Sequence, residues 1–271
     1  MQEMLFLFKE GADEMSNCFS DKYVRLRLLY QSSTVKVWLV RSRIGQSLCV
    51  AKCANRCTSA ATDIFLEAIL LQDLRHPGIP IFYELMEENT EIIMIEEYVF
   101  GVSLHQYLLY NQKISQETFL NFAIQICEIV SYLHFHRSGP IVYLDMKPEH
   151  IIVCGNRLKI IDFGIANFLP ISGKNIQKFG TKKYAAPEQK SGKPIGVYTD
   201  VYGVGKVLEE MLKHLRPTER IHFRKLVLES TRRNIHFRSK DIRHLICQLN
   251  QKKNRINQNR KYLEVSAESL K

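Results

Sequence analysis

Polar and apolar residues alternate along much of the first third of the chain, a pattern typical of half-buried β-strands. Residues 35–39 alternate and are followed, after a short turn, by the apolar run 48–53, which predicts a hairpin. Residues 79–86 and 91–99 predict a second hairpin. Between the two hairpins, apolar residues recur at helical spacing over 62–74. These elements together predict a small antiparallel sheet with one inserted helix.

Helical spacing dominates the remainder of the chain. The predicted helices cover residues 115–135, 186–215, 221–229 and 241–249. The last residues, 251–271, are rich in Asn, Gln, Lys and Arg and show no periodicity, so we expect a basic, flexible tail there.

The change of pattern predicts an α+β, bilobal chain. The small antiparallel β lobe with its one helix is expected over about 23–99, and the larger, mainly α lobe over about 100–250. Residues 1–22 are expected to form an N-terminal extension. A cleft between two lobes is the default place for a ligand.

Composition narrows the class of protein. Of the 271 residues, 45% are hydrophobic and 24% are charged, which is ordinary for a globular protein and excludes a collagen or a wholly disordered chain. No apolar run approaches the length of a membrane span. The seven cysteines are scattered without a CxxC pair. Free thiols in a cytoplasmic protein are therefore expected, rather than a disulfide framework or a zinc site.

The net charge of +10 comes from one end of the chain. Residues 213–271 hold 16 Lys and Arg against 5 Asp and Glu. A basic segment raises the question of nucleic acid, but the aromatic residues there are few and no groove-binding module is visible. A solvated basic face or an acidic protein partner is the favoured interpretation.

A further predicted hairpin, over residues 151–161, is flanked by the residues that indicate a chemical function. Apolar strands at 151–154 and 158–161 are joined by Gly155-Asn156-Arg157, a tight-turn signal. A hairpin returns the chain to its starting point, so Asp145 and Asp162, just outside its two ends, are expected to lie in one site.

Two carboxylates and a lysine in one site suit metal-assisted phosphoryl transfer. One carboxylate would orient the attacking hydroxyl and accept its proton, the other would hold a magnesium ion, and Lys147 would offset charge on the transferred group. Each residue alone is weak evidence, because an aspartate after a strand is usually a turn or cap residue. The combination of the two aspartates and the lysine in one site is a specific signal for phosphoryl transfer.

With these residues the chain resembles the protein kinase family from Tyr23 to Leu249. The family's catalytic loop reads Tyr-Leu-Asp-Met-Lys-Pro-Glu-His at 143–150, and its Asp-Phe-Gly and Ala-Pro-Glu motifs are intact at 162–164 and 186–188. The other matching positions are the strand lysine Lys52, the helix glutamate Glu67, the anchoring aspartate Asp200 and the late arginine Arg238. The wording Ala-Pro-Glu-Gln resembles the eukaryotic-like kinases of bacteria.

The resemblance implies a serine/threonine kinase that uses ATP and Mg²⁺ or Mn²⁺ to phosphorylate protein substrates. It places Asp145, Lys147 and Thr181 in catalysis, and Asp162 and His150 at the metal. It implies that the nucleotide is contacted by Lys52, Glu67, Val37, Ala51, Glu97, Val99 and Ile152.

Each of these positions also has an ordinary structural explanation. Lys52 alone is equally typical of a strand edge, Glu67 of an exposed helix face, and Thr181 of a turn cap. The positions matched to adenine are also ordinary core positions. Ser172 is a phosphosite candidate by its place in the activation segment, and otherwise a loop serine.

The chain departs from the family at its glycine-rich loop, where Tyr30, Ser32 and Val35 replace the three glycines. Glycines let backbone amides approach phosphates closely, so weaker ATP binding is expected. His150 replaces the second metal ligand, which favours manganese over magnesium. Leu144 replaces the arginine that pairs with a phosphorylated activation loop.

Two more departures concern a buried position and a missing helix. Glu96 falls at an apolar position of the nucleotide pocket, unless the strand register slips by one residue. Only residues 216–220 separate the helix of Asp200 from the next helix, where the family has another helix and long loops for docking substrates.

These departures keep two alternatives open. A pseudokinase, which binds or scaffolds a partner without transfer, is favoured by His150 and by the missing glycines. A small-molecule kinase shares the fold, but Lys147 and the Ala-Pro-Glu segment argue against it because they shape a protein-substrate cleft.

Overall fold

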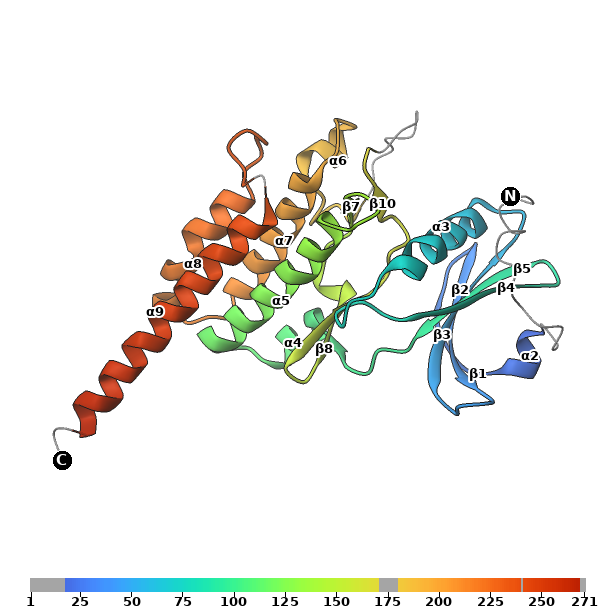
Figure 1. Ribbon diagram of the computed structural model, residues 1–271, viewed down its shortest axis with the longest axis horizontal. Coiled ribbons are helices and arrows are strands. Elements are labelled where there is room, and N and C mark those ends of the chain that lie inside the picture. The colour runs from blue at the N-terminus through green and yellow to red at the C-terminus, as the bar shows by residue number, and fades with distance from the viewer. Residues whose placement is uncertain (1–17, 171–179, 240, 269–271) are drawn as a thin grey trace. The chain divides into compact units, whose positions relative to one another are not determined.

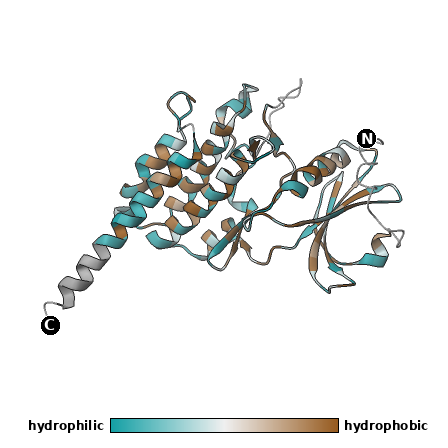
Figure 2. Cartoon of the chain, viewed as in Figure 1, coloured by the Kyte–Doolittle hydropathy of each residue, from teal (hydrophilic) through white to brown (hydrophobic). Residues whose placement is uncertain are grey.

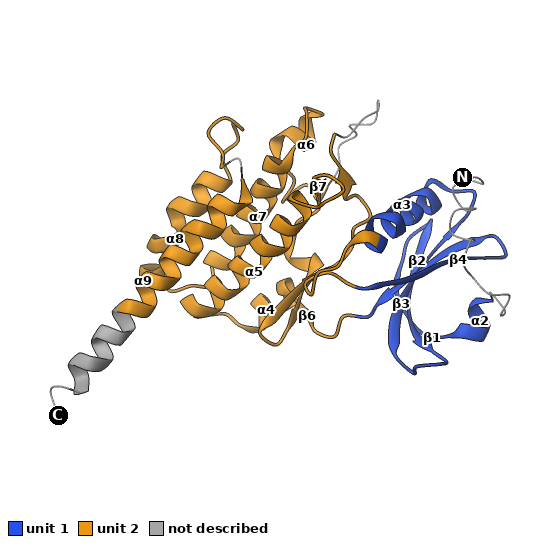
Figure 3. Cartoon of the chain, in the orientation of Figure 1, with its two compact units in different colours: residues 1–72, 81–98 blue, residues 73–80, 99–271 orange. Residues whose placement is uncertain are grey.

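The computed structural model describes residues 18–170, 180–239 and 241–268. The chain divides into two compact units (Figure 3). Unit 1 comprises residues 1–72 and 81–98, and unit 2 comprises residues 73–80 and 99–271.

Unit 1 is built around a five-stranded antiparallel sheet with the strand order β1-β2-β3-β5-β4 (Figure 1). Its elements are α2 (Phe19–Lys22), β1 (Tyr23–Gln31), β2 (Val35–Ser42), β3 (Leu48–Asn55), α3 (Ser59–Asp73), β4 (Phe82–Glu88) and β5 (Glu91–Glu97). The predicted small antiparallel sheet with one inserted helix is therefore confirmed, with the short helix α2 added before β1.

The strand β3 presents different chemistry on its two faces, because successive side chains of a strand alternate. Cys49, Ala51 and Cys53 are buried in an apolar cluster on one face. The intervening residues Val50 and Lys52 point to the opposite face. The sheet therefore carries its apolar core on one side and its charged lysine on the other.

Unit 2 is mainly helical, and its longer helices α5, α7, α8 and α9 pack on one another. Its helices are α4 (Leu104–Tyr110), α5 (Gln116–His134), the 3₁₀ turn η1 (Pro148–His150), α6 (Pro187–Ser191), α7 (Val197–Leu212), α8 (Pro217–Ser230) and α9 (Ile242–Glu268). Figure 2 shows apolar residues concentrated along α5 and α7. Helix α5 starts where predicted, since the Ser115 hydroxyl accepts the Thr118 amide at 3.0 Å as an N-cap.

Two small sheets in unit 2 connect its loops. One pairs β7 (Ile141–Val142) with β10 (Asn167–Phe168), and the other has the order β6-β8-β9. The strands of the second sheet are β6 (Val102–Ser103), β8 (Ile151–Cys154) and β9 (Arg157–Ile160). The predicted hairpin of β8 and β9 is confirmed, and Gly155 takes the positive φ of 63° that its tight turn needs.

The helical predictions need three corrections. The single helix expected over 186–215 is broken between α6 and α7, because Gly192 adopts a left-handed conformation (φ 66°) and Pro194 follows it. Helix α8 begins at Pro217, so only residues 213–216 connect it to α7. The segment expected as a flexible tail from residue 251 instead continues α9 as far as Glu268.

The remaining expectations concern the first residues, the cysteines and the membrane. Residues 1–17 of the expected N-terminal extension lie outside the described residues. All seven cysteines are free thiols. Among the helices that the structure describes, none combines the length and apolar character needed to cross a membrane.

A buried ion pair joins α6 to the loop before α9. Arg238 Nη1 lies 2.6 Å from Glu188 Oε1, and Arg238 Nη2 lies 3.1 Å from Glu188 Oε2. The same guanidinium donates to the carbonyls of Tyr198 and Arg232, and its carbon lies 4.9 Å from the centre of the Tyr202 ring. Both charged side chains are almost fully buried. Each charge therefore depends on the other for its compensation.

Replacing this arginine is expected to destabilise the fold strongly. Arg238→Met leaves the Glu188 carboxylate buried without its counter-ion, which costs about 3–5 kcal/mol. Urea denaturation measures this loss in the free energy of unfolding. The matched control is Arg137→Met, because Arg137 also pairs with a carboxylate, Asp73, but is fully exposed. The control should leave the free energy of unfolding nearly unchanged, and equal losses in the two variants would contradict the prediction.

Candidate active site

Three predicted catalytic residues meet in unit 2 at the loop that follows β7. Lys147 Nζ lies 2.7 Å from Asp145 Oδ2 and 3.1 Å from Thr181 Oγ1. Thr181 donates to Asp145 Oδ1 through both its hydroxyl, at 2.9 Å, and its amide, at 3.0 Å. One oxygen of the carboxylate is thus bound by the threonine and the other by the lysine. This network fixes the orientation of the Asp145 carboxylate.

A buried carboxylate holds the backbone of this loop in a strained conformation. Leu144 has a φ of 68°, which is unusual for a residue other than glycine. Asp200 accepts the amides of Tyr143 at 2.8 Å and of Leu144 at 2.9 Å, and lies 2.9 Å from His134 Nε2. Gln189 Nε2 donates to the Leu144 carbonyl at 2.9 Å. The strained residue is therefore held at both its amide and its carbonyl.

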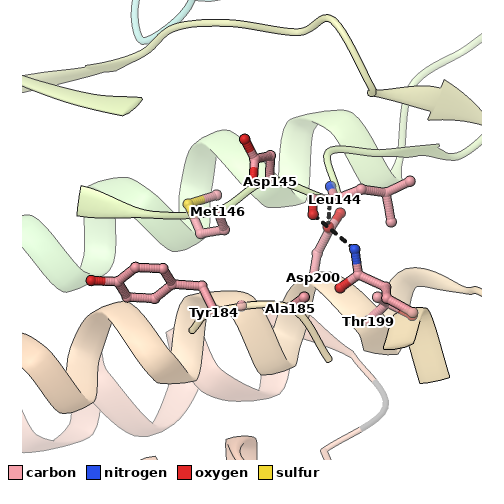
Figure 4. A pocket seen from close by; sticks show the side chains of 9 residues that line it. Leu144, Asp145, Met146, Tyr184, Ala185, Thr199 and Asp200 are labelled. Atoms are coloured by element: carbon pink, nitrogen blue, oxygen red, sulfur yellow. Dashed lines mark hydrogen bonds between the residues drawn. The ribbon is translucent and has the colours of Figure 1, made fainter. Parts of the chain in front are cut away.

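Helix α7 brings Asp200 to the loop because a glycine permits close packing. A Cβ added to Gly203 would lie 2.9 Å from the Cβ of Met146, closer than side-chain atoms pack. Figure 4 shows Asp145 pointing away from Asp200. Asp200 therefore anchors the loop from one side, while the Asp145 carboxylate faces the opposite side.

The two residues expected at the metal also lie together. His150 Nε2 is 3.3 Å from Asp162 Oδ2, and His150 Nδ1 is 3.5 Å from Asp145 Oδ2. The sequence argument from the hairpin, that Asp145 and Asp162 share one site, is borne out, with the His150 ring in contact with both. Half of the Asp162 side chain is exposed, whereas the His150 ring is mostly buried.

These donors fit a metal ion that phosphates complete. A carboxylate oxygen and a neutral imidazole nitrogen are both metal ligands, and magnesium in phosphoryl-transfer sites takes only one or two protein ligands besides phosphate oxygens. Within the described parts of the chain, no three His, Cys, Asp or Glu side chains are arranged to hold a metal by themselves. Asp162 and His150 would form the protein part of such a ligand set.

In unit 1, Lys52 is bound by two carboxylates. Its Nζ lies 2.5 Å from Glu67 Oε1 on α3 and 3.2 Å from Glu96 Oε1 on β5. The predicted pair of Lys52 with Glu67 is therefore present. Glu96 lies on the Lys52 side of the sheet because Val50, two residues before Lys52, pairs with Glu96 across the strands. The observed strand register therefore has no one-residue slip, and Glu96 is buried at the position that the sequence predicted.

In the β1–β2 turn, where the family has its glycines, the side chain of Ser32 binds the backbone amides. Ser32 Oγ accepts the amides of Val35, at 3.0 Å, and of Thr34, at 3.3 Å. The Ser32 amide in turn donates to the Val35 carbonyl at 2.9 Å. Amides that would be available to a phosphate in a glycine loop are here occupied by a side chain.

The positions predicted to surround adenine divide between the two units. Val37 lies directly opposite Lys52 on the neighbouring strand, so the two side chains share a face of the sheet. Ala51 does not share it: it is fully buried in the apolar cluster on the other face, and the prediction for Ala51 is wrong. The reason is the two-residue period of a strand, which gives Val50 the place assigned to Ala51.

The other predicted nucleotide residues are placed as follows. Glu97 ends β5, and its amide donates to the Ile81 carbonyl at 2.8 Å. Val99 and Ile152 belong to unit 2, and Ile152 is half-buried on β8 opposite Ser103.

Ser172 lies outside the described residues. Two features escaped the sequence analysis. The hydroxyl of Ser32 accepts hydrogen bonds from amides of its own turn. A serine at the first position of a turn commonly makes such bonds, so the sequence held a signal for this feature. The hydroxyl of Tyr143 lies 3.0 Å from His150 Nδ1, and no sequence signal links these two residues.

Comparison with known proteins gives the same assignment along the chain. The family profile described as protein kinase domain matches residues 23–264. Death-associated protein kinase 2 from Mus musculus is 30% identical over 171 residues, covering 60% of this chain and 45% of that protein. The protein of the same name from Homo sapiens is 29% identical over the same length, with the same coverage. The chain thus aligns with less than half the length of these relatives. It belongs to the protein kinase domain family.

Proposed function

We propose that this protein is a serine/threonine kinase that transfers the γ-phosphoryl group of ATP to hydroxyl groups of proteins. The observation that carries the proposal is the network of Asp145, Lys147 and Thr181. In it, a partly exposed carboxylate is oriented by a cation and a hydroxyl, which is what a group that positions a substrate hydroxyl requires.

Each residue of the network has a defined task. Asp145 accepts a hydrogen bond from the substrate hydroxyl and takes its proton as the bond to phosphorus forms. Lys147, 2.7 Å from the same carboxylate, lies where its charge also offsets the negative charge on the transferred group. Thr181 binds one carboxylate oxygen through its hydroxyl and its amide, and so holds the carboxylate in the orientation in which its other oxygen, which also accepts from Lys147, would meet the substrate.

Nucleotide and metal each have candidate ligands among the predicted site residues. Lys52 would bind phosphate oxygens, with Glu67 setting its direction. Asp162 and His150 would hold the metal ion, which supplies positive charge to the phosphate oxygens. Because imidazole is a poorer ligand for magnesium than for transition ions, we propose a preference for Mn²⁺ over Mg²⁺.

The pseudokinase alternative also has a specific observation in its favour. The turn amides of Thr34 and Val35 are occupied by Ser32, and Lys52 is neutralised by two carboxylates rather than one. Both features weaken the binding of phosphates. A small-molecule kinase gains no such support, because Thr181 and the Ala-Pro-Glu segment are linked to the catalytic loop through Asp145 and Gln189.

Phosphoryl transfer from γ-labelled ATP tests the proposal directly. The purified protein should label itself or a generic protein acceptor, faster in Mn²⁺ than in Mg²⁺. Asp145→Asn should lower the rate about 100-fold or more, since it removes the proton acceptor, and Lys52→Met should abolish transfer. Asp63→Asn, an exposed aspartate on α3, is the matched control and should leave the rate unchanged. No label in either metal, from protein shown to be folded, would establish the pseudokinase alternative.

Opening the β1–β2 turn is expected to strengthen nucleotide binding. Ser32→Gly releases the Thr34 and Val35 amides, and one recovered hydrogen bond of about 1 kcal/mol corresponds to about fivefold tighter binding. Isothermal titration with ATP and Mn²⁺ measures the dissociation constant. Ser33→Gly, at the exposed neighbouring position, adds the same backbone freedom without releasing these amides. An equal change in both variants would contradict the role given to the Ser32 hydroxyl.

An acidic protein segment is the partner that the charge of unit 2 favours. A cavity of about 510 Å³ lies between α6 and the loop before α9. Its lining residues are Pro187, Glu188, Ser191, Lys193, Pro194, Tyr198, Arg233, Asn234, Ile235 and His236. The acid in this set, Glu188, is neutralised by Arg238. No ion-pair partner for Lys193, Arg233 or His236 is found among the described residues. The cavity therefore has a net positive rim and apolar walls.

Reversing two charges at the cavity should weaken binding of an acidic partner. The double change Lys193→Glu with Arg233→Glu is expected to weaken binding of a fluorescent Glu-rich peptide about tenfold or more, since each exposed ion pair contributes up to about 1 kcal/mol. Fluorescence anisotropy gives the dissociation constant. The control, Arg224→Glu with Lys225→Glu on α8, changes the net charge equally away from the cavity. Equal weakening in the two variants would indicate general charge attraction and overturn the assignment.

A further inference from the structure

Two exposed lysines lie on a short turn that is attached to the catalytic network. Thr181 binds Asp145 through its hydroxyl and its amide, and the Thr181 carbonyl accepts the amide of Tyr184 at 2.9 Å. These bonds close a turn whose middle residues are Lys182 and Lys183. Both lysines are exposed, whereas Tyr184 is buried. The turn therefore starts at the Asp145 carboxylate and carries two cations on its outer side.

The far end of the turn is also fixed. Tyr184 and Asp145 line the same small pocket (Figure 4). Lys183 Nζ lies 3.1 Å from Glu210 Oε2 on α7 and 5.0 Å from the centre of the Tyr184 ring. Because the turn is held on both sides of Lys182, the fold sets the place of this residue relative to Asp145.

The charges of the turn are not fully compensated. Glu210 is shared by Lys183 and Lys213, each at 3.1 Å, so one carboxylate faces two ammonium groups. No ion-pair partner for Lys182 is found among the residues that the structure describes. Lys182 is therefore the charge of this turn that is most available to a ligand.

The other charged side chains near the turn do not cancel this excess. Asp145 is already paired with Lys147 at 2.7 Å. Glu149, on η1, is exposed, and its Oε1 lies 3.7 Å from His105 Nδ1. With Glu149 counted, two carboxylates stand against three lysines, so a positive charge remains beside the catalytic loop.

A substrate hydroxyl placed at Asp145 brings its neighbours along the peptide close to this turn. An extended peptide advances about 3.3–3.6 Å per residue, so residues up to three positions from the hydroxyl lie within about 11 Å of it. Lys182 directly follows Thr181, whose hydroxyl is 2.9 Å from Asp145 Oδ1. A carboxylate at these peptide positions would be attracted by the uncompensated charge, and a basic side chain would be repelled.

We propose that Lys182 is a specificity-determining residue that selects protein substrates with an acidic residue within three positions of the phosphorylated hydroxyl. The inference rests on the proposed function, because in it Asp145 positions the substrate hydroxyl. Lys183 contributes less, since Glu210 offsets its charge. The selection is electrostatic and exposed to solvent, so it weakens as the salt concentration rises.

A set of short peptides tests this selection. Each peptide has one serine in an alanine background, with aspartate, lysine or alanine at one of the three positions on either side. With γ-labelled ATP and Mn²⁺, at least one position should show a kcat/KM about two- to fivefold higher for aspartate than for alanine, mainly through KM, as expected for one exposed ion pair. Raising the salt to about 0.5 M should reduce this preference.

Lys182→Glu is expected to reverse the preference. At the position where the wild type favours aspartate, the variant should favour lysine by a similar factor, which a merely structural role of Lys182 would not produce. Lys182→Gln, which removes the charge without reversing it, should abolish the preference. The matched control is Lys253→Glu on α9, also an exposed lysine, and it should keep the wild-type preference. Fluorescence anisotropy of the same peptides, labelled at one end, measures binding independently of transfer.

The outcomes separate this inference from the proposed function. A preference for aspartate that Lys182→Glu reverses and Lys253→Glu keeps supports the assignment. Labelled serine without such a preference, or an equal change in both variants, overturns the assignment and leaves the kinase proposal standing. Loss of the preference in Lys193→Glu with Arg233→Glu instead would place the acidic residue in the cavity beside α6 and also overturn it. If no acceptor is labelled, the proposed function fails, and equal anisotropy titrations for the aspartate and alanine peptides would overturn the role of Lys182 as well.

Discussion

The buried carboxylate of Asp200 is the constraint on which the catalytic loop depends. A leucine with positive φ costs about 1–3 kcal/mol, and it persists only where the surroundings determine it. Asp200 supplies that determination by accepting two consecutive amides, and Gln189 completes it at the Leu144 carbonyl. Because Gln189 belongs to α6 and Asp200 to α7, the packing of the helical unit directly sets the position of the residue next to Asp145.

The two units differ in how completely they retain the chemistry of their family. Unit 2 keeps a fully connected network around Asp145, including the lysine and the threonine. Unit 1 keeps the Lys52–Glu67 pair, but adds Glu96 to it and closes the phosphate-binding turn with Ser32. Under the proposed function, the departures therefore affect phosphate binding rather than the positioning of the substrate hydroxyl. Under the same proposal, this arrangement combines weak nucleotide binding with a complete network for transfer.

The sequence predicted much of this arrangement where local signals were strong. A tight turn between two apolar strands was enough to place Asp145 and Asp162 together, since a hairpin must return on itself. It misplaced Ala51 because neighbouring residues of a strand face opposite sides, so a motif matched one residue out of register reverses the face. The continuation of α9 beyond residue 251 was missed because a polar helix lacks the apolar stripe that marks helical spacing. The contact of Tyr143 with His150 depends on tertiary packing, which no local pattern records.

The position of Glu96 also has a consequence for inhibitor chemistry. Beside Lys52, where Glu96 is almost fully buried, a compound would meet a carboxylate already engaged with the lysine. An apolar ring placed there would have to displace this ion pair and leave charge without compensation, which is costly. A compound bearing an amine would instead add a second cation to a cluster that holds two carboxylates and one lysine. If the proposed function places a compound beside Lys52, a basic group directed at Glu96 would suit this excess of negative charge better than an apolar one.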